Sequence, residues 1–174
     1  MNKLLHILHL LRWRLSTNKK RVVLARKMGV RAGENCEIFG DVQLGSEPYL
    51  IELGNNVRVT SNVKFVTHDG GLWVIRNLYG IKNIDSFGKI VVGNNVHIGW
   101  NTVIMPGVTI GDNCVIGVGA VVTKNIPSNS VAVGVPARVI ETIDEYYNKS
   151  KDTYVDTYGM SKDEKEIALR KLIK

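Results

Sequence analysis

The sequence predicts an all-β solenoid, with a helical arm before it and a helical tail after it. Three observations lead to this prediction: a six-residue repeat through the middle of the chain, a first segment that is basic and has no acid, and a last segment with helix-start signals. The chain has 174 residues, 44% of them hydrophobic, which suffices for one ordinary domain with a buried core. We therefore divide it into an arm at 1–31, a solenoid at 32–140 and a tail at 141–174.

The arm carries the positive charge of the chain. Residues 1–31 hold nine of the 23 Lys and Arg residues and none of the 16 acids, so the rest of the chain has a formal charge of −2 although the whole chain is +7. A solenoid with that balance offers no basic stripe. We therefore expect no nucleic-acid partner.

Leucine and isoleucine dominate the first part of the arm. His6, His9, Arg12 and Arg14 interrupt them well short of the roughly 20 apolar residues that span a bilayer, and no small-residue cleavage site follows. We expect a helix of about 12–15 residues and then a second, basic helix. Two interpretations stay open: residues 1–20 rest on an anionic membrane surface, or the helix packs on the fold or on a neighbouring subunit.

A period of six residues begins after the arm. Examples are LGNNVR from Leu53, VGNNVH from Val92 and IGDNCV from Ile110. The first position is always aliphatic or Phe, the second is often Gly, and the fifth is small or aliphatic except at Asp69. A helix would repeat at steps of three and four, whereas period six fits short strands joined by tight corners of Gly or Asn. Three strands then make one coil of about 18 residues, and coils stack at about 4.8 Å.

The two ends of the solenoid and one interruption follow from the same register. Weaker hexads start at Ala32 and Ile38, a closing one starts at Ser128, and the register is abandoned over 69–91, where we expect a protruding loop. An open end coil would expose unpaired strand edges, so a cap is needed. We assign that role to the tail from Glu141, whose last helix has the capping box Ser161-Lys-Asp-Glu.

The cysteines and histidines limit the chemistry. Cys36 and Cys114 are far apart and have no metal-ligand spacing, which predicts reduced thiols, a cytoplasmic protein and no metal. His68 stands in the fourth position of its hexad, outside the coil and at the root of the excursion 69–91. Function concentrates in loops on rigid scaffolds and imidazole titrates near neutrality, so His68 is a candidate general base, with a solvated surface histidine as the alternative.

The hexads, the phrase IGWNTVIMPGVTIGDNCVIGVGAVVTKNIP and the closing VAVGVPARVI together resemble the hexapeptide-repeat acyltransferases. The resemblance covers about residues 32–140 and implies a left-handed parallel β-helix, although most parallel connections are right-handed. THDGG followed by the excursion is similar to the maltose and galactoside O-acetyltransferase and polysaccharide O-acetyltransferase branch. That branch implies a homotrimer with acetyl-CoA bound between two subunits and active sites there.

Acetyl transfer from a thioester to a hydroxyl needs a base and donors for the oxyanion. The resemblance implies that His68 is the base in a direct attack and that the backbone N–H of Trp100 stabilises the oxyanion. Cys114, at a buried corner position, would be a poor nucleophile. A backbone carbonyl, rather than the adjacent Asp69, is expected to orient His68, because neighbouring residues on an extended chain point apart.

The resemblance also implies two binding regions. The expected cofactor residues are Gly99, Gly117 and Val118 for the pantetheine arm, and Thr123, Lys124 and Arg138 for the nucleotide phosphates. The glycines have an alternative explanation, because the coil itself requires Gly at corners. The expected acceptor residues, from the excursion and the preceding coil, are Asp41, Glu47, Trp73, Arg76 and Tyr79. His97 stands where many sugar acetyltransferases of this type carry Trp, and it replaces that aromatic wall, assists His68 or does neither.

The predicted function is acetyl-CoA-dependent O-acetylation of a sugar or polysaccharide precursor in the cytoplasm. The basic arm favours a lipid-linked acceptor at the inner membrane surface. Two alternatives stay open: N-acetylation of an amino sugar on the same scaffold, and a non-catalytic solenoid that serves as a binding platform. A zinc carbonic anhydrase on a similar coil would need three histidines around one metal, and the solenoid has only His68 and His97.

Overall fold

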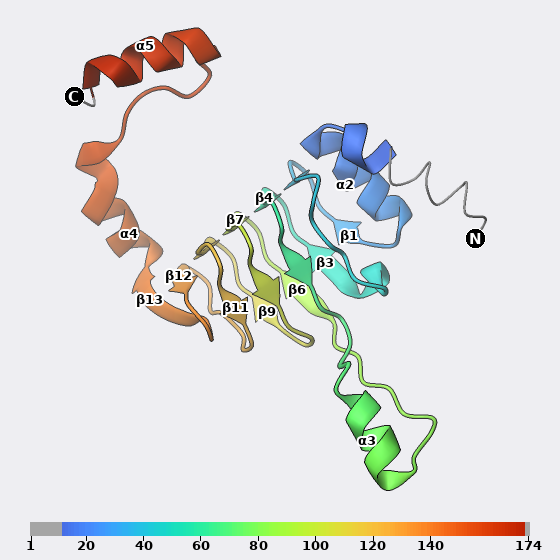
Figure 1. The fold of residues 1–174 in the computed structure, drawn as a ribbon. Helices are drawn as coiled ribbons and strands as arrows, with labels where there is room; N and C mark the ends of the chain where they lie inside the picture. Colours follow the sequence, from blue (N-terminus) through green and yellow to red (C-terminus); the bar gives the residue numbers. More distant parts are fainter. Residues whose placement is uncertain (1–11, 173–174) are drawn as a thin grey trace.

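Three β-sheets wind around one hydrophobic core in the computed structural model, which describes residues 12–172 (Figure 1). Sheet A contains β1 (Arg31–Ala32), β3 (Ile51–Leu53), β6 (Ile90–Val92) and β9 (Thr109–Ile110). Sheet B contains β2 (Glu37–Ile38), β4 (Val57–Val59), β7 (Val96–Ile98), β10 (Cys114–Ile116), β12 (Ser130–Val133) and β13 (Arg138–Thr142). Sheet C contains β5 (Lys64–Phe65), β8 (Val103–Ile104) and β11 (Val121–Val122).

The chain visits the three sheets in turn, so each strand pairs with a strand of the next coil and not with its neighbour in sequence. Val57, Val96 and Cys114 are parallel register partners in sheet B, one from each successive coil. The parallel solenoid is therefore confirmed. We name its corners A/B, B/C and C/A after the sheets that they join.

The six-residue register predicts correctly which side chains are interior. First-position residues such as Phe65 and Ile104 are 2% and 0% exposed, and fifth-position residues such as Val63 and Cys114 are 0% and 1% exposed. The fifth-position hydroxyl of Thr102 is also buried and donates to the carbonyl oxygen of Gly99 at 2.7 Å. Stacked aliphatic rows thus fill the prism, as an alternation of inward and outward positions requires.

Asparagines form the A/B corner. Asn56, Asn95, Asn113 and Asn129 have φ values of 55°, 56°, 54° and 59°, the left-handed region that Asn tolerates better than most residues. The Asn95 amide donates to the Asn113 side-chain oxygen at 3.0 Å, and the Asn113 amide donates to Asn129 at 2.9 Å. The same residues therefore turn the chain and join successive coils.

The arm packs on the first coil. Residues 12–15 are helical, and α2 (Asn18–Lys27) begins after Thr17, whose hydroxyl accepts from the Lys20 N–H. Val22 and Ala25 of α2 are buried in the core cluster, and the Trp13 indole N–H donates to the carbonyl oxygen of Gly40 at 2.6 Å. The packed interpretation therefore holds for this inner face, whereas the helix expected over the first 11 residues lies outside the described residues.

The excursion contains a helix where the sequence predicts a loop. Its stem is antiparallel, with the Asp69 N–H bonded to Ser86 O and the Gly88 N–H to Thr67 O, both at 2.9 Å. Beyond the stem, α3 (Leu72–Tyr79) projects away from the prism and ends at the left-handed Gly80 (Figure 1). The prediction of a loop was wrong here because loss of period six excludes a coil but not a helix. The coil resumes at Ile90, within the predicted excursion.

The far end is closed by a strand that reverses direction. β13 pairs antiparallel with β12, so the closure begins at Arg138, slightly before the expected Glu141. It leads into α4 (Ile143–Ser150), the short turn η2 (Lys151–Thr153) and α5 (Lys162–Leu172). The predicted capping interactions at α5 are present, with the Ser161 N–H donating to the Glu164 carboxylate at 2.8 Å. Within residues 12–172, no helix has both the length and the apolar character that crossing a membrane requires.

Candidate functional site

His68 lies at the C/A corner, where the chain leaves sheet C for the excursion. Its side chain is 46% exposed, and its Nδ1 lies 3.1 Å from the Glu47 Oε2 and 3.4 Å from the Ser46 Oγ. Glu47 belongs to the preceding coil and is followed directly by the short helix η1 (Pro48–Leu50). A carboxylate and an imidazole from two successive coils therefore meet at the root of the excursion.

Thr67 fixes the carboxylate of this pair. Its buried hydroxyl donates to the Glu47 Oε2 at 2.7 Å, the same oxygen that faces His68. The hydrogen bond from Thr67, with smaller contributions from Ser46 and His68, holds the pKa of the Glu47 carboxyl below its usual range. An anionic Glu47 is an acceptor only, so it selects the tautomer with the proton on His68 Nδ1 and leaves a lone pair on Nε2. That is the state a general base requires.

Gly45 allows the two coils to approach here. Its φ is +69°, and a Cβ at this position would lie 3.0 Å from Phe65 O and 3.1 Å from the Thr67 Oγ1. Glycine therefore satisfies both the left-handed backbone and the close approach. The turn that it makes presents Glu47 to His68.

The expectation of a backbone carbonyl beside His68 was wrong, because Glu47 occupies that place. Asp69 does not orient His68 either, since its carboxylate accepts from the Gly71 N–H at 2.8 Å. The missed signal was the register: Gln43 bridges Lys64, an offset of 21 residues, and the same offset separates Glu47 from His68. Glu47 was expected to contact the acceptor, and the structure gives it the histidine as its partner.

Phe87 is the aromatic neighbour of His68. The two rings meet edge to face, with centroids 6.3 Å apart and planes inclined by 63°. His68 and Phe87 also face each other across the antiparallel stem. Sequence reasoning missed Phe87 because the pairing within the excursion leaves no periodic trace.

The other expected acceptor residues do not gather at His68. Trp73 and Tyr79 are exposed on α3, whereas the Arg76 guanidinium donates to Ile84 O at 2.9 Å and pairs with Asp85, which closes the excursion on itself. Asp41 lies in a groove of about 360 Å³ beside Trp13, at the B/C corner of the first coil. Within one chain, only Glu47 of this set therefore contacts the histidine.

The residues expected to bind the cofactor fall on two different corners. Thr123 and Lys124 follow β11 at the C/A corner, two coils along from His68, and both are exposed. The other group lies at the B/C corner or at the far end of the solenoid next to it: Gly99, Trp100, Gly117, Val118 and Arg138. A single chain therefore does not bring His68 to Trp100.

The B/C corner offers an apolar surface and a free donor. The side chains of Trp100 and Val118 are 56% and 71% exposed, and the corner carbonyl of Trp100 accepts from the Gly119 N–H at 2.6 Å. The Trp100 N–H itself donates to no acceptor in the described part of the chain. Gly99 has a structural reason to be glycine, because a Cβ there would lie 2.7 Å from Ile116 O of the next coil.

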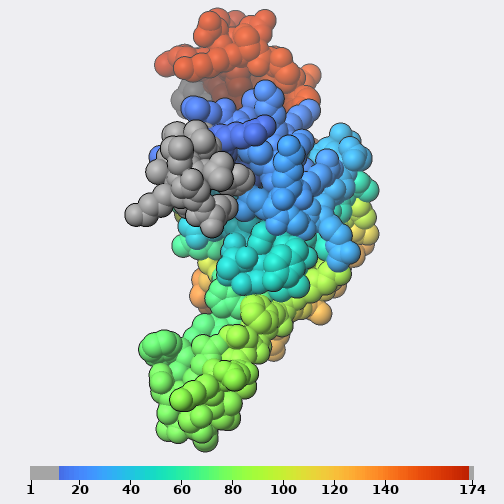
Figure 2. All heavy atoms as spheres, turned by 90° about the vertical axis from the view of Figure 1, so that its right-hand side faces the viewer, coloured from blue at the N-terminus to red at the C-terminus, as the bar shows by residue number. Residues whose placement is uncertain are grey.

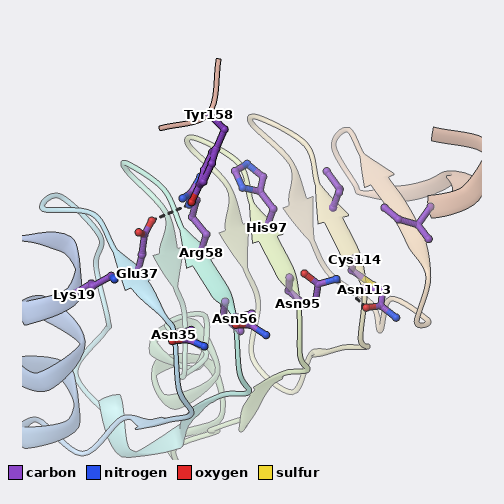
Figure 3. A pocket seen from close by; sticks show the side chains of 14 residues that line it. Lys19, Asn35, Glu37, Asn56, Arg58, Asn95, His97, Asn113, Cys114 and Tyr158 are labelled. Carbon is purple, nitrogen blue, oxygen red and sulfur yellow. Dashed lines mark hydrogen bonds and ion pairs between the residues drawn. The ribbon is translucent and has the colours of Figure 1, made fainter. Parts of the chain in front are cut away.

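His97 lies on sheet B, the face of the prism opposite the C/A corner. Its register partner Arg58 is paired with Glu37 at 2.9 Å, and all three line an open groove of about 550 Å³ (Figure 3). Burial and the charge of Arg58 lower the pKa of His97. Within one chain His97 therefore does not assist His68.

The thiols and the acids add no second reactive centre. Burial raises the pKa of both Cys36 and Cys114, so the two thiols stay protonated at neutral pH. Among residues 12–172 no three His, Cys, Asp or Glu side chains are grouped so as to hold a metal ion.

Comparisons with known sequences match this chain over most of its length. The family described as bacterial transferase hexapeptide (six repeats) matches residues 89–124. Protein CapG of Staphylococcus aureus is 44% identical over 146 residues, which are 83% of this chain and 84% of that protein. Galactoside O-acetyltransferase of Escherichia coli (strain K12) is 47% identical over 154 residues, with 75% of this chain and 74% of that protein covered.

Solved structures of acetyltransferases are also similar to this chain. A galactoside acetyltransferase in complex with coenzyme A superposes with a TM-score of 0.58 at 31% identity and covers 91% of this chain and 88% of that one. A maltose O-acetyltransferase from Clostridium difficile 630 has a TM-score of 0.52 at 29% identity, with 77% and 82% covered. The likeness thus extends well beyond the repeat itself.

Proposed function

The chain belongs to the hexapeptide-repeat acetyltransferases, and from this premise we propose that it transfers the acetyl group of acetyl-CoA to a hydroxyl of a sugar or polysaccharide precursor, with His68 as the general base. The observation that carries this proposal is the 3.1 Å contact between Glu47 and His68 Nδ1 at the C/A corner. Family membership is also our ground for a left-handed winding of the coils.

The proposed reaction uses the free nitrogen of His68. Nε2 takes the proton of the acceptor hydroxyl while the hydroxyl oxygen attacks the thioester carbonyl, and Glu47 stabilises the imidazolium that forms. Collapse of the tetrahedral intermediate breaks the carbon–sulfur bond, and His68 returns its proton to the departing thiolate. No acyl-enzyme is needed, in keeping with the protonated thiol of Cys114.

We place the active site between two subunits of a homotrimer, where the C/A corner of one chain meets the B/C corner of the next. The separation of His68 from Trp100 within one chain supports this arrangement. The free Trp100 N–H would then face the oxyanion, and the exposed Trp100 and Val118 side chains would contact the pantetheine arm. Thr123, Lys124 and Arg138 suit the nucleotide phosphates, because cationic and hydroxyl donors bind phosphate oxygens well.

The test is thiol release from acetyl-CoA in the presence of a panel of sugars and amino sugars. The native chain should give acceptor-dependent release, and His68→Ala should lower that rate by about 10²–10⁴, the usual contribution of a general base. Mass spectrometry of the product before and after mild alkali separates an O-acetyl ester, which loses its acetyl group, from an N-acetyl amide, which keeps it. Acetyl-CoA binding without release for any acceptor, or an unchanged rate in His68→Ala, would contradict the proposal.

A further inference from the structure

We propose that the α2 end of the solenoid docks on an anionic phospholipid bilayer and thereby presents His68 to a membrane-anchored acceptor. The docking surface is a cationic face that consists of Arg12, Arg14, Lys20, Lys27 and, at the edge where this face meets the groove on sheet B, Lys19. The acceptor part of this inference rests on the proposed function, whereas the docking part does not.

The cationic face is the outer side of an arm whose inner side is already used. Val22 and Leu24 of α2 are buried against the first coil, whereas the five cationic side chains are exposed. None of the five forms an ion pair with another described residue. The first acid after residue 12 is Glu34, and it lies 3.5 Å from Arg26.

Two of these cations have an unfavourable position within the helix. Lys19 and Lys20 lie in the first turn of α2, where the helix dipole is positive, and that turn contains no acid. Asp or Glu at these positions would stabilise the helix, because a negative charge interacts favourably with its N-terminus. An external anion, in contrast, is attracted both by the lysines and by the helix terminus.

Apolar side chains between the cations favour lipid over nucleic acid as the partner. Leu15 is 85% exposed and Val23 is 50% exposed on the arm, and Tyr49 of the adjacent η1 is 61% exposed. Tyr49 belongs to the same surface, because a Cβ at Gly29, just beyond α2, would lie 2.9 Å from its Cβ. Figure 2 looks at this end and shows α2 in blue above the turquoise segment around η1. Interfacial surfaces of membrane-bound proteins combine Lys and Arg with apolar side chains in this way.

The site lies close to this end. Glu47 directly precedes η1, and His68 belongs to the coil stacked on it. One coil spacing of about 4.8 Å and the thickness of α2, about 10–12 Å, place His68 roughly 15–20 Å from the outer face of the arm, which would meet the lipid head groups. A sugar attached to a membrane anchor could reach the base at that height, which identifies a lipid-linked sugar as the acceptor class.

The docking test uses the full chain and sedimentation with vesicles of phosphatidylcholine, with or without phosphatidylglycerol. The triple variant Lys19→Glu, Lys20→Glu, Lys27→Glu reverses three of the five charges of the cationic face. The control Lys162→Glu, Lys165→Glu, Lys171→Glu makes the same change of charge on the exposed α5. A basic residue near an anionic surface contributes about fivefold to binding, so the arm variant should lose at least about 100-fold in partitioning and the control little. Binding should also weaken as salt rises.

Three results would overturn the docking. They are no preference for anionic vesicles, an equal loss in the arm and α5 variants, and tighter binding to duplex DNA than to vesicles at the same salt. The second result would mean that net charge alone drives adsorption. The third would identify the face as a nucleic-acid surface.

Acetyl transfer to a soluble sugar separates this inference from the proposed function. The arm variant should keep the native rate on a soluble acceptor and lose it on a lipid-linked sugar in anionic vesicles. Vesicle binding without any transferase activity would reject the proposed function and keep the docking. Equal rates of native and arm variant on the vesicle-borne acceptor would reject the role of docking in acceptor presentation.

Discussion

At the residue scale, Glu47 fixes the orientation and the tautomer of His68, which an isolated surface histidine would not have. Thr67 holds one carboxylate oxygen, that oxygen contacts His68 Nδ1, and the basic nitrogen is thereby left on the solvent side. Each member comes from a backbone that is itself constrained, Thr67 by the antiparallel stem, where its carbonyl oxygen accepts from the Gly88 N–H, and Glu47 by the turn at Gly45. The position of the imidazole is therefore set before any substrate arrives, which is what an efficient base requires.

Glu47→Gln should lower kcat by at least about tenfold, because a neutral amide no longer stabilises the imidazolium. As a positioning residue, Glu47 should act on kcat and leave the KM for the acceptor nearly unchanged, because it contacts the base and not the acceptor. Glu145→Gln, at the capping box of α4, is the matched control and should leave both unchanged. A rise in KM as large as the fall in kcat would contradict the positioning role of Glu47.

The lowered pKa of Glu47 also predicts how stability depends on pH. A carboxyl whose pKa is lower in the folded state stabilises the fold above its unfolded pKa of about 4.3, and this contribution is lost as the pH falls through the folded value. The difference in melting temperature between the native chain and Glu47→Gln should therefore be constant near neutrality and shrink below about pH 4. A constant difference down to pH 2 would show that the Thr67 and His68 contacts do not favour the anion.

At the scale of elements, the inner face of α2 packs well on the first coil, whereas the lysines in its first turn are unfavourable for the helix dipole. Arg21 is buried and its guanidinium donates to Trp13 O at 2.9 Å and to Arg14 O at 3.1 Å, which ties α2 to the preceding turn. The outer lysines Lys19, Lys20 and Lys27 form no side-chain hydrogen bond or ion pair with other residues in the described range 12–172. The inner contacts therefore stabilise α2, whereas its outer charges leave its first turn without a favourable partner for the helix dipole.

Lys19→Glu and Lys20→Glu should each raise the free energy of unfolding by about 0.3–1 kcal/mol at low salt, because they place a negative charge at the positive end of the helix dipole. Lys27→Glu, in the last turn, makes the same change at the opposite end and should lower it. Urea unfolding of the three variants measures this. Equal effects at both ends would mean that net charge, and not the helix, is responsible.

The corners of the coils are the second feature at this scale. Gly99→Ala would place a Cβ 2.7 Å from Ile116 O and 2.8 Å from Val118 N, both backbone atoms of the next coil. We expect a loss of about 1–3 kcal/mol in urea unfolding, the usual result of overpacking. Gly70→Ala in the excursion meets nothing within 4 Å and should stay within about 0.5 kcal/mol of the native chain. A mild Gly99→Ala would mean that the coil spacing adapts.

For the whole molecule, period six predicted the interior of the prism but not the arrangement around it. Hexad positions report which side a residue faces, and this determined the core and the outward place of His68. They carry no information about contacts made outside the register. The helix α3 and the reversed strand β13 could therefore not be predicted. The Glu47 contact, in contrast, follows the same offset of 21 residues as the bridge between Gln43 and Lys64, and that signal was missed. The separation of Trp100 from His68 follows once each residue is assigned to its corner.

The proposed homotrimer, with each site formed by the C/A corner of one chain and the B/C corner of the next, predicts complementation between subunits. His68→Ala destroys the C/A half of a site, and Val118→Arg blocks the B/C half, so each variant alone should be inactive. In mixed trimers some sites combine the intact halves, and equal mixing should restore about a quarter of the native rate. The measurement is thiol release after refolding or co-expression of the two variants. Failure to recover, while mixed trimers form, would place both halves of the site in one chain.

The two ends of the prism are closed by different elements, α2 at one and β13 at the other, so neither end fixes how many coils lie between them. What does depend on the coil number is the distance from His68 to Lys124, two coils or roughly 10 Å along the axis. If the phosphates and the thioester of one donor molecule are held at those two points, the number of coils between them sets the length of the donor that the solenoid accepts. Insertion of one 18-residue coil between His68 and Lys124 would repeat the same corners and core positions. It would also lengthen the distance between the two points by about 4.8 Å, so that the same donor would no longer reach both.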